Sequence, residues 1–167
     1  PNRARRHGCG CAKPVPRNPG AGRQIARRDL RHFPLRLAAE RLLFSKCFNA
    51  GQVCTTVDHV YVPHAKITEF VKLSKTIVKG RYPKISSPDY SSIIDQRAFD
   101  RLVHAMDDAR ERGATLITLL PGAPYDAATR KINPTIVLNA PEDCVLLQRE
   151  IFGPILPLRG YTQLETV

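Results

Sequence analysis

Cys54 is the side chain of this sequence best suited to act as a nucleophile. It closes the run Phe48-Asn-Ala-Gly-Gln-Val-Cys54, between a predicted helix at 35–46 and a predicted strand at 59–62. A loop at this point can expose a thiol in a cleft, and the glycine lets the backbone pass close to a substrate. The thiolate is the attacking form of cysteine. A buried structural cysteine is the alternative interpretation of a single Cys.

A second segment with chemical potential is Glu150-Ile-Phe-Gly-Pro154, which lies just before the final predicted strand. A carboxylate can accept hydrogen bonds from ribose hydroxyls, and an aromatic ring can pack on a flat heterocycle. The alternative is a turn with one exposed acid and one phenylalanine in the core. Either segment alone is weak support for a function.

Together, the two segments resemble the aldehyde dehydrogenase superfamily. The resemblance rests on Phe-x-x-x-Gly-Gln-x-Cys followed, about a hundred residues later, by Glu-Ile-Phe-Gly-Pro, and it covers residues 33–167. Pro134-Thr135 before a strand and Gln148 before Glu150 also fit the pattern. Within the superfamily, Tyr90-Ser-Ser-Ile-Ile94 and the Phe48 run are most similar to the coniferyl aldehyde dehydrogenase branch.

The resemblance implies a role for three residues. Cys54 would attack the aldehyde carbonyl, and its own N–H would help to hold the oxyanion. A hydride would then pass to NAD or NADP, leaving a thioester that water hydrolyses to the carboxylic acid. Glu150 would hold the nicotinamide ribose, and Phe152 would lie near the nicotinamide. The implied substrate is a small-molecule aldehyde, and the parent enzyme is expected to be a homo-oligomer.

Several parts of the family pattern are missing. The general base of the family lies in a Glu-Leu-Gly-Gly-Lys strand upstream of the cysteine, and this sequence has no such motif. The oxyanion-hole asparagine and the glycine-rich cofactor turn are absent too, and Arg149 stands where the family has an acid. We therefore interpret the chain as a fragment of the catalytic domain. No metal site is expected, because His7-x-Cys9-x-Cys11 lacks a fourth ligand and a usual spacing.

Hydrophobic periodicity predicts the elements that position these segments. Apolar residues recur at helical spacing in three stretches that begin near residues 35, 67 and 99, and Gly80 and Gly113 are expected to end the second and third helices. Strands are predicted at 59–62, 115–120, 135–138 and 155–158, and a loop at 123–131. Helices that alternate with strands indicate an α/β fold, here a partial catalytic domain with a mostly parallel sheet and flanking helices.

The positive charge is confined to one end of the chain. The net charge is +11, but residues 1–36 hold ten Lys and Arg against the single acid Asp29, so the rest is nearly neutral. We therefore expect no nucleic-acid partner for the folded part, and no membrane partner. The competing hypotheses are a non-catalytic module whose basic arm contacts nucleic acid, and a thiol esterase that needs no cofactor. Five irregularly spaced cysteines favour the cytoplasm over a disulfide-bonded location.

Residues 1–32 form a basic segment without helical or strand periodicity. One permitted coding sequence for Lys13–Arg27, read one base out of frame, encodes Glu-Leu-Gly-Gly-Lys. Our hypothesis is that residues 1–32 are either unstructured or a frameshifted translation of the missing strand. The nucleotide sequence tests this directly, because stop codons in the alternate frame would rule it out.

The purified chain is expected to produce no NADH from an aldehyde. Two cofactor contacts cannot offset the entropy lost on binding a dinucleotide, and a missing general base typically lowers the rate about 10²–10⁴-fold. The measurement is absorbance at the NADH band with aromatic and aliphatic aldehydes. NADH production that Cys54→Ala abolishes would contradict this expectation.

Overall fold

The computed structural model describes residues 34–163, so the predicted segment at 1–32 lies outside the described residues. The described part contains α1 Leu35–Cys47, the 3₁₀ turn η2 Phe48–Gly51, β1 Val60–Pro63, η3 His64–Lys66, α2 Ile67–Arg81, α3 Gln96–Glu111, β2 Thr115–Thr118, β3 Tyr125–Asp126, β4 Lys131–Ile132, β5 Thr135–Leu138, α4 Val145–Gln148 and β6 Ile155–Tyr161. No helix within this part is long and apolar enough to cross a membrane.

The principal sheet has the strand order β1-β6-β5-β2. β6 runs parallel to both β1 and β5, with Val60 opposite Leu158 and Thr135 opposite Ile155. β2 joins β5 antiparallel at the other edge. The predicted α/β fold with a mostly parallel sheet is therefore confirmed.

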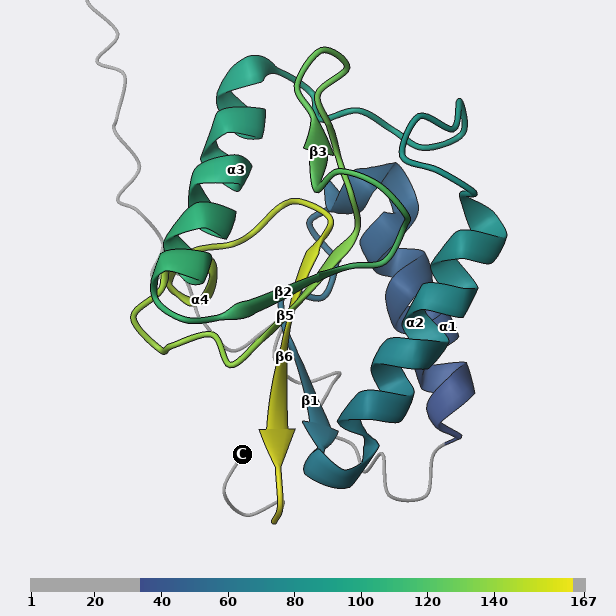
Figure 1. The fold of residues 1–167 in the computed structure, drawn as a ribbon, viewed down its shortest axis with the longest axis vertical. Coiled ribbons are helices and arrows are strands. Elements are labelled where there is room, and N and C mark those ends of the chain that lie inside the picture. Colours follow the sequence, from purple (N-terminus) through teal and green to yellow (C-terminus); the bar gives the residue numbers. More distant parts are fainter. Residues whose placement is uncertain (1–33, 164–167) are drawn as a thin grey trace, which may run out of the picture.

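Helices cover both faces of this sheet (Figure 1), with α1 and α2 on one side and α3 and α4 on the other. Successive strand residues point to opposite faces, and the two cores follow that alternation. Ile136 and Leu156 pack with the α1–α2 layer, whereas Val137 and Ile155 pack with the α3–α4 layer. Because both faces are covered, these central strands are nearly continuously apolar.

Local signals explain the bounds of α3. The Asp95 carboxylate accepts a hydrogen bond from the Ala98 N–H at 2.7 Å, a helix N-cap that starts the helix at Gln96. Gly113, at φ 88°, turns the chain out of the helix after Glu111. The predicted end at Gly113 is thus confirmed within two residues.

Three sequence predictions are corrected by the structure, and one short helix was not predicted. α2 runs through Gly80 to Arg81. β2 ends at Thr118 instead of Leu120, because the Leu120 N–H donates to the side chain of Asn133. The predicted loop at 123–131 contains β3, which pairs with β4. The short helix α4 was not predicted, since four residues are too few to show a helical period.

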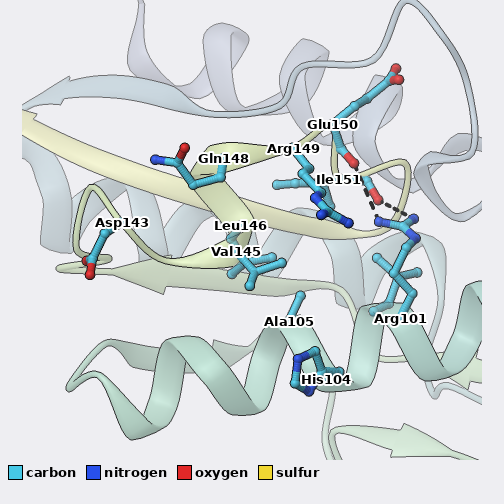
Figure 2. A pocket seen from close by; sticks show the side chains of 11 residues that line it. Arg101, His104, Ala105, Asp143, Val145, Leu146, Gln148, Arg149, Glu150 and Ile151 are labelled. Carbon is cyan, nitrogen blue, oxygen red and sulfur yellow. Dashed lines mark hydrogen bonds between the residues drawn. The ribbon is translucent and has the colours of Figure 1, made fainter.

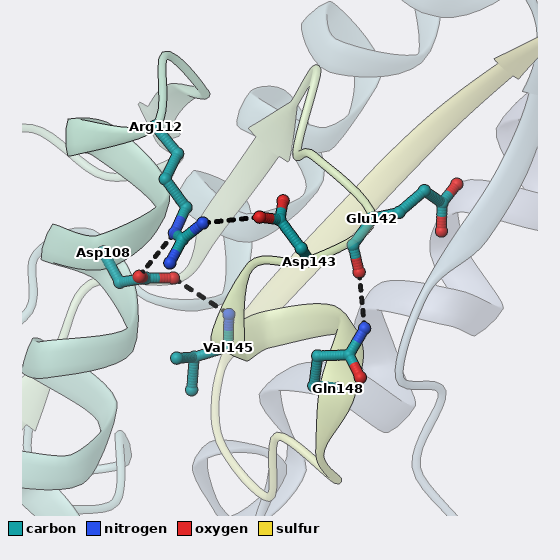
Figure 3. Close-up of polar contacts among 6 residues, drawn as sticks. All are labelled: Asp108, Arg112, Glu142, Asp143, Val145 and Gln148. Carbon is teal, nitrogen blue, oxygen red and sulfur yellow. Dashed lines mark hydrogen bonds and ion pairs between the residues drawn. The ribbon is translucent and has the colours of Figure 1, made fainter.

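A polar network fastens α4 to α3 (Figure 3). The Asp108 carboxylate accepts hydrogen bonds from the Val145 N–H at 2.9 Å and from the Arg112 guanidinium at 2.7 Å. Arg112 also pairs with Asp143 at 2.7 Å. The Val145 amide first, and then Arg112, lower the pKa of Asp108 below its usual 3.8.

This network predicts acid sensitivity of the α3–α4 contact. Because the pKa of Asp108 is lower in the fold than in the unfolded chain, its contribution is present above pH 3.8 and is lost as the pH falls through the folded pKa. The urea unfolding midpoint should therefore decrease as the pH is lowered from 6 to 2. In Asp108→Asn, the midpoint should depend less on pH over this acidic range. Asp107→Asn is the matched control, since Asp107 makes an exposed pair with Arg110. If the urea midpoint of Asp108→Asn depended on pH as strongly as that of the original chain, Asp108 would not be the source of the acid sensitivity.

Candidate functional site

Cys54 lies at the tip of a turn between η2 and β1. The Thr56 N–H donates to the Val53 carbonyl oxygen at 3.1 Å, which closes the turn around the cysteine. Cys54 is exposed, whereas Cys47 and Cys144 are buried in the core. Among the three described cysteines, the thiol of Cys54 is therefore the accessible one.

The chain before Cys54 is held in an uncommon backbone conformation. Asn49, Ala50 and Gly51 have φ values of 48°, 50° and 71°, in the left-handed region. Gln52 stabilises this path with its side chain. Its Nε2 donates to the Asn49 and Ser92 carbonyl oxygens at 3.0 and 3.1 Å, and its Oε1 accepts from the Ile94 N–H at 2.9 Å.

Gly51 brings the cysteine loop against the Glu150 segment. A Cβ atom at Gly51 would lie 2.4 Å from the Gly153 carbonyl oxygen and 2.9 Å from the Lys46 carbonyl oxygen. Such distances leave room for a hydrogen atom only, so the two backbones are in direct contact. The structure thus joins the two segments that the sequence singled out.

The sheet topology explains why these segments meet. The cysteine loop precedes β1 and the Glu150 segment precedes β6, and β1 and β6 are parallel neighbours. The segments before two adjacent parallel strands emerge at the same edge of a sheet. The candidate site therefore lies at the amino ends of β1 and β6.

Arg101 of α3 holds the Glu150 segment by its backbone (Figure 2). Its guanidinium donates to the Ile151 carbonyl oxygen at 2.7 Å and to the Glu150 carbonyl oxygen at 3.4 Å. On the opposite side of the peptide, the Ile151 N–H donates to the Asp58 carboxylate at 3.2 Å. These contacts leave the Glu150 carboxylate exposed and Phe152, at φ 49°, 38% exposed.

A cavity of about 330 Å³ lies between α3 and the Glu150 segment. Its walls include Arg101, His104, Arg149 and Glu150, so both signs of charge face it (Figure 2). Cys54 and Phe152 do not line this cavity. Within the described residues, the exposed thiol and the cavity therefore do not form one pocket.

Lys46 is a buried charge beneath the cysteine loop. It is 2% exposed, and its ammonium donates to the Val57 carbonyl oxygen at 2.9 Å. Burial lowers its pKa to about 8, although Asp58, Cys47 and Glu150 act in the other direction. Burial also raises the pKa of the adjacent Cys47 to about 12.

The structure adds residues that sequence reasoning did not assign. Gln52 appeared only as a letter of the cysteine motif, and no sequence signal marked Lys46, Asp58 or Arg101. Each of these contacts joins positions that are 11 to 93 residues apart. Among residues 34–163, no three His, Cys, Asp or Glu side chains gather as metal ligands, and the His7, Cys9, Cys11 group lies outside that range.

Comparison with known proteins identifies relatives of the chain. A family model described as the aldehyde dehydrogenase family matches residues 30–167. A "Probable coniferyl aldehyde dehydrogenase" of Pseudomonas aeruginosa is 44% identical over 133 residues, which are 79% of this chain and 27% of the relative. The coniferyl aldehyde dehydrogenase of Pseudomonas sp. HR199 is 39% identical over 131 residues, 77% of this chain and 27% of the relative. The chain thus spans about a quarter of the length of these relatives.

Solved structures share the fold. The substrate-bound state of Staphylococcus aureus AldH superposes with a TM-score of 0.71 at 28% identity, covering 79% of this chain and 28% of that protein. The NADP-dependent glyceraldehyde-3-phosphate dehydrogenase of Bacillus halodurans, complexed with NADP, has a TM-score of 0.66 at 26% identity, covering 77% of this chain and 26% of that protein.

The exposure of Cys54 predicts the order in which thiols react. Brief treatment with iodoacetamide should label Cys54 before Cys47 and Cys144, because the latter are buried and burial keeps the Cys47 thiol protonated. Peptide mass mapping measures the labelled fractions. Preferential labelling of Cys47 or Cys144 would contradict the placement of the loop.

The Gly51 contact predicts a large effect of one added methyl group. Gly51→Ala should lower the free energy of unfolding by about 2–4 kcal/mol, through left-handed strain and overlap with the Gly153 carbonyl. Gly160→Ala is the control. A Cβ there would lie 2.3 Å from the His64 ring, but His64 is an exposed side chain that can turn away, so the cost should stay under about 1 kcal/mol. Equal costs in urea titrations would show that the Gly51 contact is not tight.

Proposed function

Because this chain belongs to the aldehyde dehydrogenase family, we propose that it contributes Cys54 as the nucleophile in NAD(P)-dependent oxidation of an aldehyde to a carboxylic acid. The observation that carries the proposal is the backbone contact between Gly51 and Gly153. It puts an exposed thiol loop beside the segment that presents Glu150 and Phe152. The proposal assigns this chemistry to residues 33–167, the predicted partial catalytic domain.

The chemistry of Cys54 follows from its accessible thiol. In the proposed reaction its sulfur attacks the carbonyl carbon to form a thiohemiacetal, and the Cys54 N–H donates to the resulting oxyanion. Oxidation at that carbon, with a nicotinamide cofactor as the hydride acceptor, would leave a thioester on Cys54. Water then attacks the thioester, which releases the acid and returns the thiol. Gly51 and Gln52 would keep the sulfur at one position through these steps.

The residues present fit one edge of a nicotinamide cofactor. Glu150 is an exposed carboxylate able to accept hydrogen bonds from ribose hydroxyls, and Phe152 offers an exposed ring to a flat heterocycle. Arg101 would keep this segment in place through its hydrogen bonds to the Glu150 and Ile151 carbonyl oxygens. A bound nicotinamide would supply the hydride acceptor. The NADP complex of the Bacillus halodurans relative supports this assignment.

The relatives suggest the substrate class. Two of them are named as coniferyl aldehyde dehydrogenases, so we propose an aromatic aldehyde of that kind. We further propose a homo-oligomeric parent enzyme, by family resemblance, and a cytoplasmic location, since the three described cysteines are free thiols.

A chimera tests the proposed function. Residues 34–163 would replace the matching segment of the Pseudomonas sp. HR199 enzyme, and NADH formation from coniferyl aldehyde would be followed. The chimera should be active, and Cys54→Ser should lower kcat by about a thousandfold or more. Thr55→Ala, a change at the exposed neighbour in the same turn, is the matched control. A folded chimera that binds NAD but forms no NADH would overturn the proposal.

A further inference from the structure

Lys46 is a buried ammonium to which the proposed reaction gives no role. It stands next to last in α1, and the hydrogen bond of its Nζ at 2.9 Å goes to the Val57 carbonyl oxygen. Val57 directly follows Thr56, the residue that closes the turn around Cys54. The lysine therefore binds the backbone at Val57, where the chain leaves the turn around Cys54.

The groups around Lys46 connect it to the Glu150 segment. Asp58 and Glu150 are the carboxylates whose charges act on the ammonium. Cys47, the next residue in α1, has a pKa of about 12 and is therefore uncharged at neutral pH, and the charge of Arg81 acts on that thiol. Asp58 in turn accepts the Ile151 N–H at 3.2 Å. One short path thus runs from Lys46 through residues 57 and 58 to residue 151.

Stability alone does not account for this lysine. Removing an ammonium from water is costly, and an apolar side chain of similar length is often as stable or more stable in such a place. The pKa of about 8 expresses that cost, since unfolded lysine has a pKa of 10.5. The unfolded chain therefore binds more protons between pH 8 and 10.5, and the fold gains stability as the pH rises through that interval. Below pH 8 the charged lysine weakens the fold.

We propose that Lys46 is a positioning residue, whose ammonium holds the exit of the Cys54 loop and, through Asp58, the Glu150 segment in one arrangement. This inference rests on the proposed function, because it gives the lysine a purpose in keeping the nucleophile and the cofactor-facing segment together. In this proposal, the positive charge of Lys46 is what holds the two segments together. A neutral amine could still donate to Val57, but it would no longer attract Asp58 and Glu150.

The test compares Lys46→Met with the full chain and with Lys75→Met, which removes an exposed lysine of α2. Amide hydrogen exchange at Ile151, corrected for its intrinsic pH dependence, reports the arrangement, and urea unfolding reports stability. In the full chain, protection of Ile151 should fall as the pH rises through about 8. In Lys46→Met, the Ile151 amide should exchange about tenfold faster at pH 7, and its protection should show no fall near pH 8. The urea midpoint of this variant at pH 7 should stay equal to that of the full chain or rise. Lys75→Met should behave as the full chain does.

A second variant keeps the test decisive if Lys46→Met unfolds. Asp58→Asn removes the carboxylate that most strongly opposes the lowering of the Lys46 pKa, and it retains an acceptor oxygen, so the pH at which Ile151 protection falls should move lower. The inference would be overturned if protection of Ile151 fell at the same pH in Asp58→Asn as in the full chain. It would also be overturned if the full chain showed no such fall. A Lys46→Met variant whose urea midpoint falls in parallel with its protection would overturn it as well, because that result marks a structural role only. None of these readouts requires turnover, so a failure of the chimera to form NADH would overturn the proposed function alone.

Discussion

The packing of Gly51 on the Gly153 carbonyl is the constraint on which the candidate site depends. The contact tolerates no Cβ, and Gly153 is confined in turn, because a Cβ there would lie 2.6 Å from a Leu102 methyl group. Leu102 is fully buried in the α3 layer. The loop that carries the thiol is therefore stacked on the core through two glycines, and its position is set by the packing of α3 against the sheet.

Parallel pairing of β1 and β6 makes this contact possible. The two strands bring their preceding segments to one edge, and the polar contacts of Gln52, Asp58 and Arg101 then hold those segments at short range. Burial of Lys46 places a charge at the same junction. The site thus combines a rigid apolar foundation with polar contacts that reach across the sheet edge, as a preorganised reactive group requires.

Sequence patterns predicted those features that depend on local or periodic signals. Helical stripes and the Gly113 signal predicted α1, α2 and α3, and apolar runs predicted the strands of the main sheet. The roles of Lys46 and Arg101 could not be predicted from the sequence, because these side chains bind carbonyl groups that come close to them only in the folded chain. The Asn133 side chain ended β2 early for the same reason, since it takes the place of a strand partner. Cys54, Glu150 and Phe152 could be proposed as site residues from the spacing of their two motifs and from the chemistry open to a thiol, a carboxylate and an aromatic ring.

The left-handed turn at Asn49 and Ala50 has a consequence for the order of folding. Each such residue costs about 1–2 kcal/mol, and local hydrogen bonds such as that from Gln52 to Asn49, worth about 1 kcal/mol each, offset only part of that cost. The stabilising partner of the turn, Gly153, lies about a hundred residues further along the chain, and closing so long a loop is slow. On a ribosome, the Gly51–Gly153 contact that fixes the loop before Cys54 can therefore form only after the segment near residue 153 has been synthesised. Until then the emerging chain carries an exposed thiol whose loop is held by local hydrogen bonds alone.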